Sequence, residues 1–318
     1  MILETLPTVP TSEELIDKAF SRAARAGRAK SGVEAQQSML QTAANILGDN
    51  AENVVTNWPD IDELDPFYYE LVDAIVGVDD LRQHLSQVTW ASRQCRDIRD
   101  EYQPKISGDP DVARKHRKQA FARLADVVES VDDSLRYLND ARGDLRKLPD
   151  IRPDEPTIVV AGYPNVGKSS FVNHVTNASN ETASYPFTTT EIRLGHVERD
   201  HIRYQLVDTP GLLDRPPEDR NEIESQAVSA LEHLADAVLV MVDASGECGY
   251  PIDVQLELRN ALAARFDVPV LTVCNKADRS RDVEADEYMS VTEGENIEGV
   301  LEALIDAVGY EPELPYDG

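Results

Sequence analysis

One eight-residue run constrains what this chain can fold into more than any other feature. Residues 162–169 read GYPNVGKS, which fits the pattern GxxxxGK[ST] at every position. The run follows the apolar segment 157–161 and precedes a segment with helical spacing through Phe171 and Val175. A strand before the pattern and a helix after it predict a phosphate-binding loop, whose backbone N–H groups and helix N-terminus face an anion. The same context disfavours a chance match in an ordinary loop.

The predicted loop carries candidate contacts for a nucleoside triphosphate. We expect Lys168 to reach the β- and γ-phosphates and the Ser169 hydroxyl to bind Mg²⁺. The candidate nucleotide contacts here are Gly162, Asn165, Val166, Gly167, Lys168, Ser169 and Ser170.

A tetrapeptide further along the chain indicates which base is bound. Asn275-Lys276-Ala277-Asp278 closes the apolar segment 268–274. An aspartate can accept two hydrogen bonds, from N1–H and from the 2-amino group of guanine, whereas adenine offers no such donor pair. We therefore expect Asp278 to select guanine, Lys276 to cover one face of the base, and Asn275 to tie this loop to the phosphate loop.

Further candidates for the metal, the γ-phosphate and the base have the expected positions. Asp208-Thr209-Pro210-Gly211 ends the apolar segment 202–207. We expect Asp208 to hold Mg²⁺ through water and the Gly211 amide to contact the γ-phosphate. One threonine of 188–190 should complete the Mg²⁺ shell, the alternative being simple β-propensity at a strand edge. Residues 290–292, with Ser290 and Val291, form a weaker candidate for a last guanine-contacting loop.

The first half of the chain has helical periodicity throughout. Two serine or threonine residues precede Glu at capping-box spacing, Thr11 with Glu14 and Ser31 with Glu34. The clearest periodic run predicts one long helix, with apolar residues at Phe121, Leu124, Val128, Val131, Leu135, Leu138 and Leu145. Such a seam is typical of antiparallel bundles, and we favour bundle core over coiled-coil dimerisation.

A proline-rich segment divides the chain. Three prolines fall within residues 149–156, which breaks any helix and favours an extended linker. Beyond it, short β-branched runs alternate with helical segments, the pattern of an α/β domain with a mostly parallel sheet. We therefore predict an all-α antiparallel bundle domain over 1–149, a linker over 150–156 and a Ras-like α/β nucleotide-binding domain over 157–318.

The charge of the chain is unusual. Its net charge is −28, with 59 acidic residues against 31 basic ones, and only 8 of the basic residues are Lys. We interpret this acidic surface as adaptation to a salt-rich solvent rather than as a binding surface. The three cysteines lie far apart and the six histidines lack paired spacing, which argues against a disulfide framework or a zinc site. No run is apolar enough to span a bilayer and no signal peptide is evident, so we expect a cytoplasmic protein.

Three of these stretches resemble one family of GTPases. Residues 162–173 (GYPNVGKSSFVN), 185–197 (YPFTTTEIRLGHV) and 208–231 (DTPGLLDRPPEDRNEIESQAVSAL) resemble the NOG (nucleolar GTP-binding protein) family of Obg-related GTPases. The resemblance continues back through the linker and implies an all-helical first half. It also implies that Thr189 is the Mg²⁺-binding threonine of the first switch loop and that Ser290 lies in the last guanine loop.

The chain departs from that family in two places. Only about a dozen residues separate Asp278 from Ser290, so the helix usual between those loops is nearly absent. The chain also stops soon after the nucleotide-binding domain, without the long tail of the eukaryotic members. It is similar to an archaeal form from a salt-rich cytoplasm, and roles of the tail are not carried over.

Two residues bear on hydrolysis. Leu212 follows Gly211, where Ras-type enzymes have a glutamine that orients water, so we expect slow turnover. Asn165 matches the residue that helps related GTPases hold K⁺ against the phosphates. K⁺ is therefore a candidate cofactor beside Mg²⁺, the alternative being that Asn165 only stabilises the loop. We expect catalysis to depend on Lys168, Thr189, Gly211 and Asn165.

A local concentration of basic residues suggests a polyanionic partner. Residues 91–147 contain 13 Arg and Lys against 11 Asp and Glu, in a chain that is otherwise strongly acidic. The densest run, with Arg114, Lys115, Arg117 and Lys118, is the candidate RNA-binding surface. A helix face balanced by its own acids is an equal alternative on charge alone.

The resemblance implies a function for the whole chain. We expect GTP and GDP binding, slow GTP hydrolysis, and a switch role in assembly of the large ribosomal subunit, whose rRNA and proteins would be partners. No membrane or DNA partner is expected. A K⁺-stimulated GTPase coupled to RNA modification is one alternative, for which we find no Cys or His constellation. A non-catalytic GTP sensor for a protein partner is the other.

Overall fold

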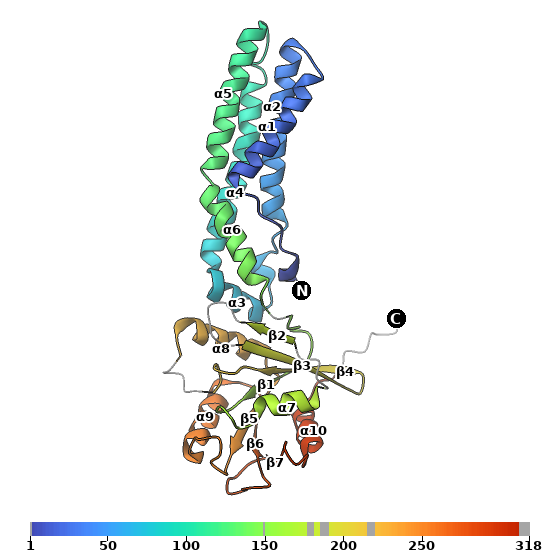
Figure 1. The fold of residues 1–318 in the computed structure, drawn as a ribbon, viewed down its shortest axis with the longest axis vertical. Coiled ribbons are helices and arrows are strands. Elements are labelled where there is room, and N and C mark those ends of the chain that lie inside the picture. Colours follow the sequence, from blue (N-terminus) through green and yellow to red (C-terminus); the bar gives the residue numbers. More distant parts are fainter. Residues whose placement is uncertain (1, 149, 177–180, 185–190, 215–219, 312–318) are drawn as a thin grey trace. The chain divides into compact units, whose positions relative to one another are not determined.

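The structure is a computed structural model that describes residues 2–148, 150–176, 181–184, 191–214 and 220–311. Contacts divide the chain into two compact units, one formed by Met1–Glu63 with Val76–Arg146 and one by Leu64–Ile75 with Lys147–Gly318. The first unit is helical, and the second contains a sheet flanked by helices (Figure 1). A helical domain followed by a Ras-like α/β domain is therefore confirmed.

The helical unit is a bundle around one apolar core. Its helices are α1 (Ser12–Arg28), α2 (Gly32–Thr56), α4 (Val78–Tyr102), α5 (Pro110–Glu129) and α6 (Asp132–Leu145), with 3₁₀ turns at Ile2–Thr5 and Ile61–Glu63. Helix α2 packs against α1, α4 and α5, and α4 also packs against α5 and α6. The long apolar side chains of the helical seams are fully buried between these helices, among them Leu15, Leu40, Leu47, Leu81, Leu124 and Leu135.

The last predicted helix is two helices. Ser130 and Val131 separate α5 from α6, and Val131 has φ −110° and ψ 14°, outside helical values. The prediction of one helix through residues 121–145 is therefore wrong, although its apolar seam stays buried on both sides of the break. β-branched residues and serine at this point lower helix propensity. The Asp132 carboxylate in the first turn of α6 accepts a hydrogen bond from the Ser12 backbone N–H at 3.1 Å, which ties the start of α6 to the start of α1.

Only one of the two predicted capping boxes forms. At the start of α1, the Thr11 side chain accepts from the Glu14 backbone N–H, and the Glu14 carboxylate accepts from the Thr11 N–H. Ser31 caps α2 in extended conformation but its side chain makes no capping hydrogen bond. The spacing therefore predicted where both helices begin. It predicted the reciprocal capping hydrogen bonds correctly only for Thr11 and Glu14.

The second unit combines most of helix α3 (Pro66–Val76) with a seven-stranded sheet. Its strands are β1 (Thr157–Ala161), β2 (Glu181–Ser184), β3 (Glu191–Arg199), β4 (Ile202–Asp208), β5 (Ala237–Asp243), β6 (Val270–Asn275) and β7 (Glu287–Tyr288). Its other helices are α7 (Lys168–Val175), α8 (Glu222–Leu234), α9 (Ile252–Arg265) and α10 (Ile297–Val308).

The order of the sheet brings the motif-bearing strand ends together. The order is β2-β3-β4-β1-β5-β6-β7. Strands β4, β1, β5, β6 and β7 are parallel, whereas β3 pairs antiparallel with β4 and β2 pairs antiparallel with β3. Strands β1 and β5 are buried along their whole length, as expected for parallel strands covered on both faces. In a sheet of this type ligands bind outside the carboxyl ends of the parallel strands. The ends of β1, β4, β5 and β6 are Ala161, Asp208, Asp243 and Asn275, and β7 ends at Tyr288.

The proline-rich segment is fixed to the second unit. The buried Gln205 side chain of β4 accepts from the Arg152 backbone N–H at 2.9 Å and donates to the Arg152 carbonyl at 2.7 Å. The Tyr68 hydroxyl donates to the carbonyl of Ile151. These bonds hold residues 151–152 against the sheet, so this part of the predicted linker has a defined place.

Two further observations concern membrane-spanning helices and cysteines among the described residues. None of their helices has the length and hydropathy that a membrane span requires. Cys95, Cys248 and Cys274 are free thiols, and each is buried.

Candidate nucleotide site

The phosphate loop is shaped by two glycines. Gly162 has φ +132°, and a Cβ there would lie 2.4 Å from the Met241 carbonyl oxygen of β5. Gly167 has φ +111°, and a Cβ there would lie 2.2 Å from the Asn275 amide nitrogen. Side chains at either position would therefore collide with the neighbouring strand or its loop, and both backbones adopt angles that favour glycine. Ser170 is exposed in the first turn of α7, where backbone N–H groups have no helical partner.

Lys168 lies inside this loop. Its side chain is buried, and Nζ donates to the carbonyl oxygens of Gly162 at 2.6 Å and Tyr163 at 3.0 Å. Burial lowers the pKa of Lys168, while the carboxylates of Asp208 and Asp214 act in the opposite direction. The loop therefore encloses a cation at the N-terminus of α7, which is the electrostatic arrangement that an oligophosphate requires.

Ser169 and Asp208 form the candidate metal site. The Ser169 hydroxyl donates to Asp208 Oδ2 at 2.6 Å, and Asp208 is fully buried at the end of β4. Burial raises the pKa of Asp208, which Ser169, Lys168 and Arg193 partly offset. Asp208 Oδ1 has no hydrogen-bond partner among the described residues. A hydroxyl beside a carboxylate with an unused oxygen is the ligand chemistry that Mg²⁺ prefers, so the residues present fit that ion.

The turn after Asp208 holds the second phosphate-facing group. Gly211 has φ +79°, and its backbone N–H donates to Asp214 Oδ2 at 2.7 Å. Leu212 is buried, with 1% of its surface exposed, and has no polar group that could orient water. Leu213 anchors the turn because its carbonyl accepts from the Gly162 N–H at 3.2 Å.

Asn275 connects the base loop to the phosphate loop. Its amide nitrogen donates to the Val166 carbonyl at 2.7 Å, and its Oδ1 accepts from the Val291 N–H at 3.1 Å. One side chain therefore joins three segments that are far apart in sequence, and each contains candidate nucleotide contacts. The tie that the sequence predicts between Asn275 and the phosphate loop is present in the structure.

Lys276 is held by a carboxylate that the sequence did not single out. Its Nζ lies 2.6 Å from Oδ2 of the fully buried Asp243, at the end of β5. Asp243 also accepts from the backbone N–H groups of Ser245 and Cys248, at 2.8 and 2.9 Å. Hydrogen bonds from Lys276 and Ser245 lower the pKa of Asp243 against the opposing effect of its burial. Lys276 itself has φ +56°, so this ion pair fixes a strained backbone position.

The short connection after Asp278 places Ser290 next to the loop that carries Asn275 and Lys276. Residues 279–286 contain no helix, as the sequence predicts. Strand β7 instead pairs with β6, and the Ala277 N–H donates to the Met289 carbonyl at 2.9 Å. Ser290 is buried and Val291 contacts Asn275, while the Asp278 residue is exposed on the adjoining turn. The structure thus brings Asn275, Lys276, Asp278, Ser290 and Val291 together.

Two of the predicted catalytic residues stand apart, one because it is exposed on the loop and one because the structure does not describe it. Asn165 is exposed with φ +64°, a conformation that asparagine tolerates better than most residues. Thr189 lies outside the described residues.

Sequence reasoning missed Asp214 and Asp243. Asp243 stands at the end of a parallel strand as Asp208 does, and this position is a usable signal for it. Asp214 carries no comparable signal, because its role depends on a local turn that brings its carboxylate back to Gly211.

Part of the predicted basic cluster is neutralised within the helical unit. Arg96 pairs with Glu52, and Arg123 and Lys105 share Glu101. Of the four RNA-binding candidates, Arg114 pairs with Asp111 at 3.3 Å. Arg117 stacks on Phe121 and donates to Gln36, and burial lowers its pKa. Lys115 and Lys118 are exposed, with no ion pair among the described residues. The cluster therefore offers fewer free cations than its composition suggests.

Comparison with known proteins assigns both halves of the chain. A model of the NOG1 N-terminal helical domain matches residues 3–152, and a model described as 50S ribosome-binding GTPase matches residues 157–276. The chain is 36% identical over 284 residues to the protein MJ1408 of Methanocaldococcus jannaschii, covering 86% of this chain and 80% of that protein.

Eukaryotic relatives are longer than this chain. Nucleolar GTP-binding protein 1 of Arabidopsis thaliana is 39% identical over 228 residues, which cover 71% of this chain and 34% of that protein. A crystal structure of nucleolar GTP-binding protein 1 from Plasmodium falciparum is 32% identical, covers 51% of this chain and 90% of that one, and has a TM-score of 0.46. The match spans less than half of the Arabidopsis thaliana protein and 46% of nucleolar GTP-binding protein 1 of Eremothecium gossypii. Its relatives above 30% identity over most of its length show that the chain belongs to the nucleolar GTP-binding protein 1 (NOG1) family of P-loop GTPases.

Proposed function

We propose that this chain binds GTP and GDP, hydrolyses GTP slowly, and acts as a switch in assembly of the large ribosomal subunit. The observation that carries the nucleotide part is the position of Asn275 between the Val166 carbonyl and the Val291 N–H. It joins a phosphate loop to a loop with the guanine-selective sequence NKAD.

In this proposal each group of the site has one role. Lys168 and the phosphate-loop amides bind the β- and γ-phosphates, while Asp278 accepts from guanine and Lys276 covers the base. Ser169 and Asp208 hold Mg²⁺, with Thr189 as a third contact, and the ion neutralises charge on the phosphates when bound. The Gly211 N–H donates to the γ-phosphate. Because Leu212 is buried and apolar, no side chain at that position orients the attacking water, and turnover is slow without an activator.

The ribosomal part of the proposal rests on family and on charge. The matched GTPase model is described as 50S ribosome-binding, and the named relatives are nucleolar GTP-binding proteins. The exposed Lys115 and Lys118 are the free cations of the run that we propose contacts rRNA or its proteins.

Three measurements on one preparation test this function. Calorimetry should give tight binding of GTP and GDP and weak binding of ATP. Single-turnover hydrolysis should be slow alone and faster with purified large subunits. Sedimentation should carry the wild-type protein with the large subunit in one nucleotide state more than the other. Lys168→Ala, which removes the phosphate-facing cation, is the control that should lose triphosphate binding. Equal affinity for ATP and GTP would refute the guanine assignment, and no association with large subunits in any nucleotide state would refute the ribosomal one.

A further inference from the structure

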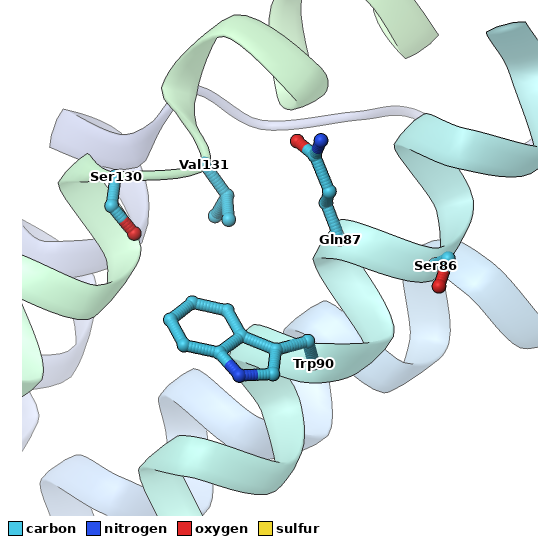
Figure 2. Close-up of a pocket in the computed structure, with 5 residues that line it drawn as sticks. All are labelled: Ser86, Gln87, Trp90, Ser130 and Val131. Carbon is cyan, nitrogen blue, oxygen red and sulfur yellow. The ribbon is translucent and has the colours of Figure 1, made fainter.

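A hollow on the helical unit lies beside the break between α5 and α6. Its lining residues are Ser86, Gln87, Trp90, Ser130 and Val131, and its volume is about 350 Å³ (Figure 2). Three of them come from α4 and two from the segment that joins α5 to α6. The interruption of the helix at Ser130 and Val131 therefore forms one wall of the hollow.

Trp90 provides a flat apolar surface in this hollow. It extends from α4 toward Ser130 and Val131 (Figure 2), and 47% of its surface is exposed, whereas the only other tryptophan, Trp58, is 6% exposed. Trp90 is thus a large aromatic group with about half of its surface open to solvent. Exposed indoles of this kind are suited to stacking against another flat ring.

Apart from Val131, the rest of the lining is polar and has unused hydrogen-bonding capacity. Gln87 Oε1 accepts from the Ser134 hydroxyl at 2.6 Å, and that hydroxyl also lies 3.0 Å from His84 Nδ1. These bonds orient the Gln87 amide, whose nitrogen has no partner among the described residues. The Ser130 hydroxyl donates to the Val127 carbonyl at 2.7 Å, so its oxygen can still accept. An aliphatic side chain in the hollow would leave these groups without partners.

An unpaired cation stands one helical turn away. Arg93 is exposed on α4 three residues after Trp90 and forms no ion pair among the described residues. The nearby Asp97 carboxylate instead accepts from the Gln94 amide at 3.3 Å. Some other arginines of the unit are neutralised, Arg82 by Asp62 and Asp79 and Arg136 by Asp132. In so acidic a chain, a free guanidinium beside an exposed indole suggests a ligand that is both flat and anionic.

We propose that this hollow binds one unpaired nucleotide of RNA. The base stacks on Trp90, its polar edge meets the Gln87 amide and the Ser86 and Ser130 hydroxyls, and Arg93 contacts a flanking phosphate. The inference deepens the proposed ribosomal function by naming the contacted group, a base outside a helix. Stacking depends weakly on salt compared with phosphate contacts, so such a site would still contribute at high ionic strength.

The fluorescence of Trp90 tests this directly. In Trp58→Phe, Trp90 is the only emitter, and titration with a single-stranded RNA of about ten nucleotides should quench it saturably. The titration is run at the lowest KCl concentration at which circular dichroism shows the folded protein. Replacing Trp90 by Ala should weaken RNA binding about 5- to 150-fold by fluorescence anisotropy of a labelled RNA, whereas Phe should retain part of the affinity.

Arg93 tests the charged half of the proposal. Arg93→Gln should weaken binding and reduce the salt dependence by about one phosphate contact, a change of roughly 0.7 in the slope of log K against log salt. The matched control is Arg28→Gln, which removes an exposed arginine from α1 and should change neither quantity.

The failure of this site and that of the proposed function have different signatures. Unquenched Trp90 emission, or equal RNA affinity of the wild type and Trp90→Ala, would overturn the nucleotide site while leaving GTP binding and subunit sedimentation intact. Quenching by extracted large-subunit proteins without quenching by RNA would also overturn it, in favour of a protein partner. Loss of GTP binding or of sedimentation by the wild type would instead count against the proposed function.

Discussion

The carboxylate of Asp214 accepts a hydrogen bond from the backbone N–H of Gly211, with 2.7 Å between Oδ2 and N. In the proposed function this N–H is the donor to the γ-phosphate of GTP. It has one hydrogen to donate, so the carboxylate and the γ-phosphate compete for it. GDP lacks the γ-phosphate and leaves the Asp214 bond intact.

Replacing Asp214 by Ala should therefore shift preference toward GTP. Loss of the competing acceptor, and of its repulsion from the γ-phosphate, should raise the ratio of GTP to GDP affinity by about 2- to 10-fold. Calorimetric titration of both nucleotides, with a non-hydrolysable GTP analogue, measures the ratio. Asp214→Asn, which keeps an acceptor without the charge, should give a smaller shift. An unchanged ratio in both variants would show that the bond only closes the local turn.

Exchanging Asp278 for Asn should change base preference. The amide replaces an acceptor by a donor, so affinity for GTP should fall by at least about tenfold while affinity for xanthosine triphosphate rises. Competition binding with both nucleotides measures the change. Asp282→Asn, an exposed carboxylate four residues further on, is the matched control and should bind GTP as the wild type does. Unaltered GTP affinity in Asp278→Asn would remove Asp278 from the base site.

Asp208 should reduce the stability of the nucleotide-free protein. Burial raises the pKa of Asp208, so the folded protein favours the protonated acid. Above the raised pKa the buried carboxylate is ionised, which lowers the stability of the fold. This loss of stability is relieved as the pH falls through the raised pKa. Asp208→Asn should therefore raise Tm at neutral pH by about 2–4 °C, which corresponds to about 1 kcal/mol, and the gain should shrink as the solution is acidified. Thermal melts over a pH series, without nucleotide or Mg²⁺, measure it. The same variant should lose Mg²⁺-dependent GTP binding, and a lower Tm than the wild type at neutral pH would contradict the prediction.

The side chain of Asn165 should make hydrolysis sensitive to the monovalent cation. We expect faster turnover in KCl than in NaCl at equal ionic strength, and Asn165→Gly should abolish the difference. Glycine is the informative replacement because it accepts φ +64° without strain, so its effect reports the amide and not the backbone. Phosphate release in matched salts, with folding checked by circular dichroism, provides the test. Equal rates of the wild type in both salts would leave Asn165 as a residue of the loop turn.

Two lysines should account for most of the contribution of the basic run to particle binding. Reversing Lys115 and Lys118 to Glu should release the protein from large subunits in sedimentation at matched salt, without changing GTP affinity. Reversing Arg114, which already pairs with Asp111, should have a smaller effect. Sedimentation of the lysine variant at the wild-type level would make the run a solvated helix face.

The predicted site residues that lie together in the structure share one property. Their positions follow from motifs whose spacing is fixed by the shape of a phosphate loop or a strand end, as with Gly162, Gly167 and Asn275. The carboxyl ends of parallel strands meet at one edge, so adjacent strands bring such motifs together without knowledge of the intervening loops.

Features that the sequence did not predict depend on partners distant in the chain or on one local turn. Val131 continues the apolar seam, and periodicity alone gave no sign of the break beside it. The sequence suggested that the basic residues were unpaired, because the acids that neutralise Arg96 lie on another helix. Those acids are Asp49 and Glu52 of α2. Asp243 looked like the end of an ordinary strand until the fold placed Lys276 against it.

Because all three thiols are buried, the native cysteines should react little with a thiol-directed label. Burial raises the pKa of Cys95 to about 12 and raises the pKa of Cys248 and Cys274 as well, so little reactive thiolate exists near neutral pH. A cysteine introduced on an exposed helix position would therefore be the principal target of a maleimide dye. Pairs of such labels, one in each unit, would turn a nucleotide-driven rearrangement into a change in energy transfer, without first removing a native residue.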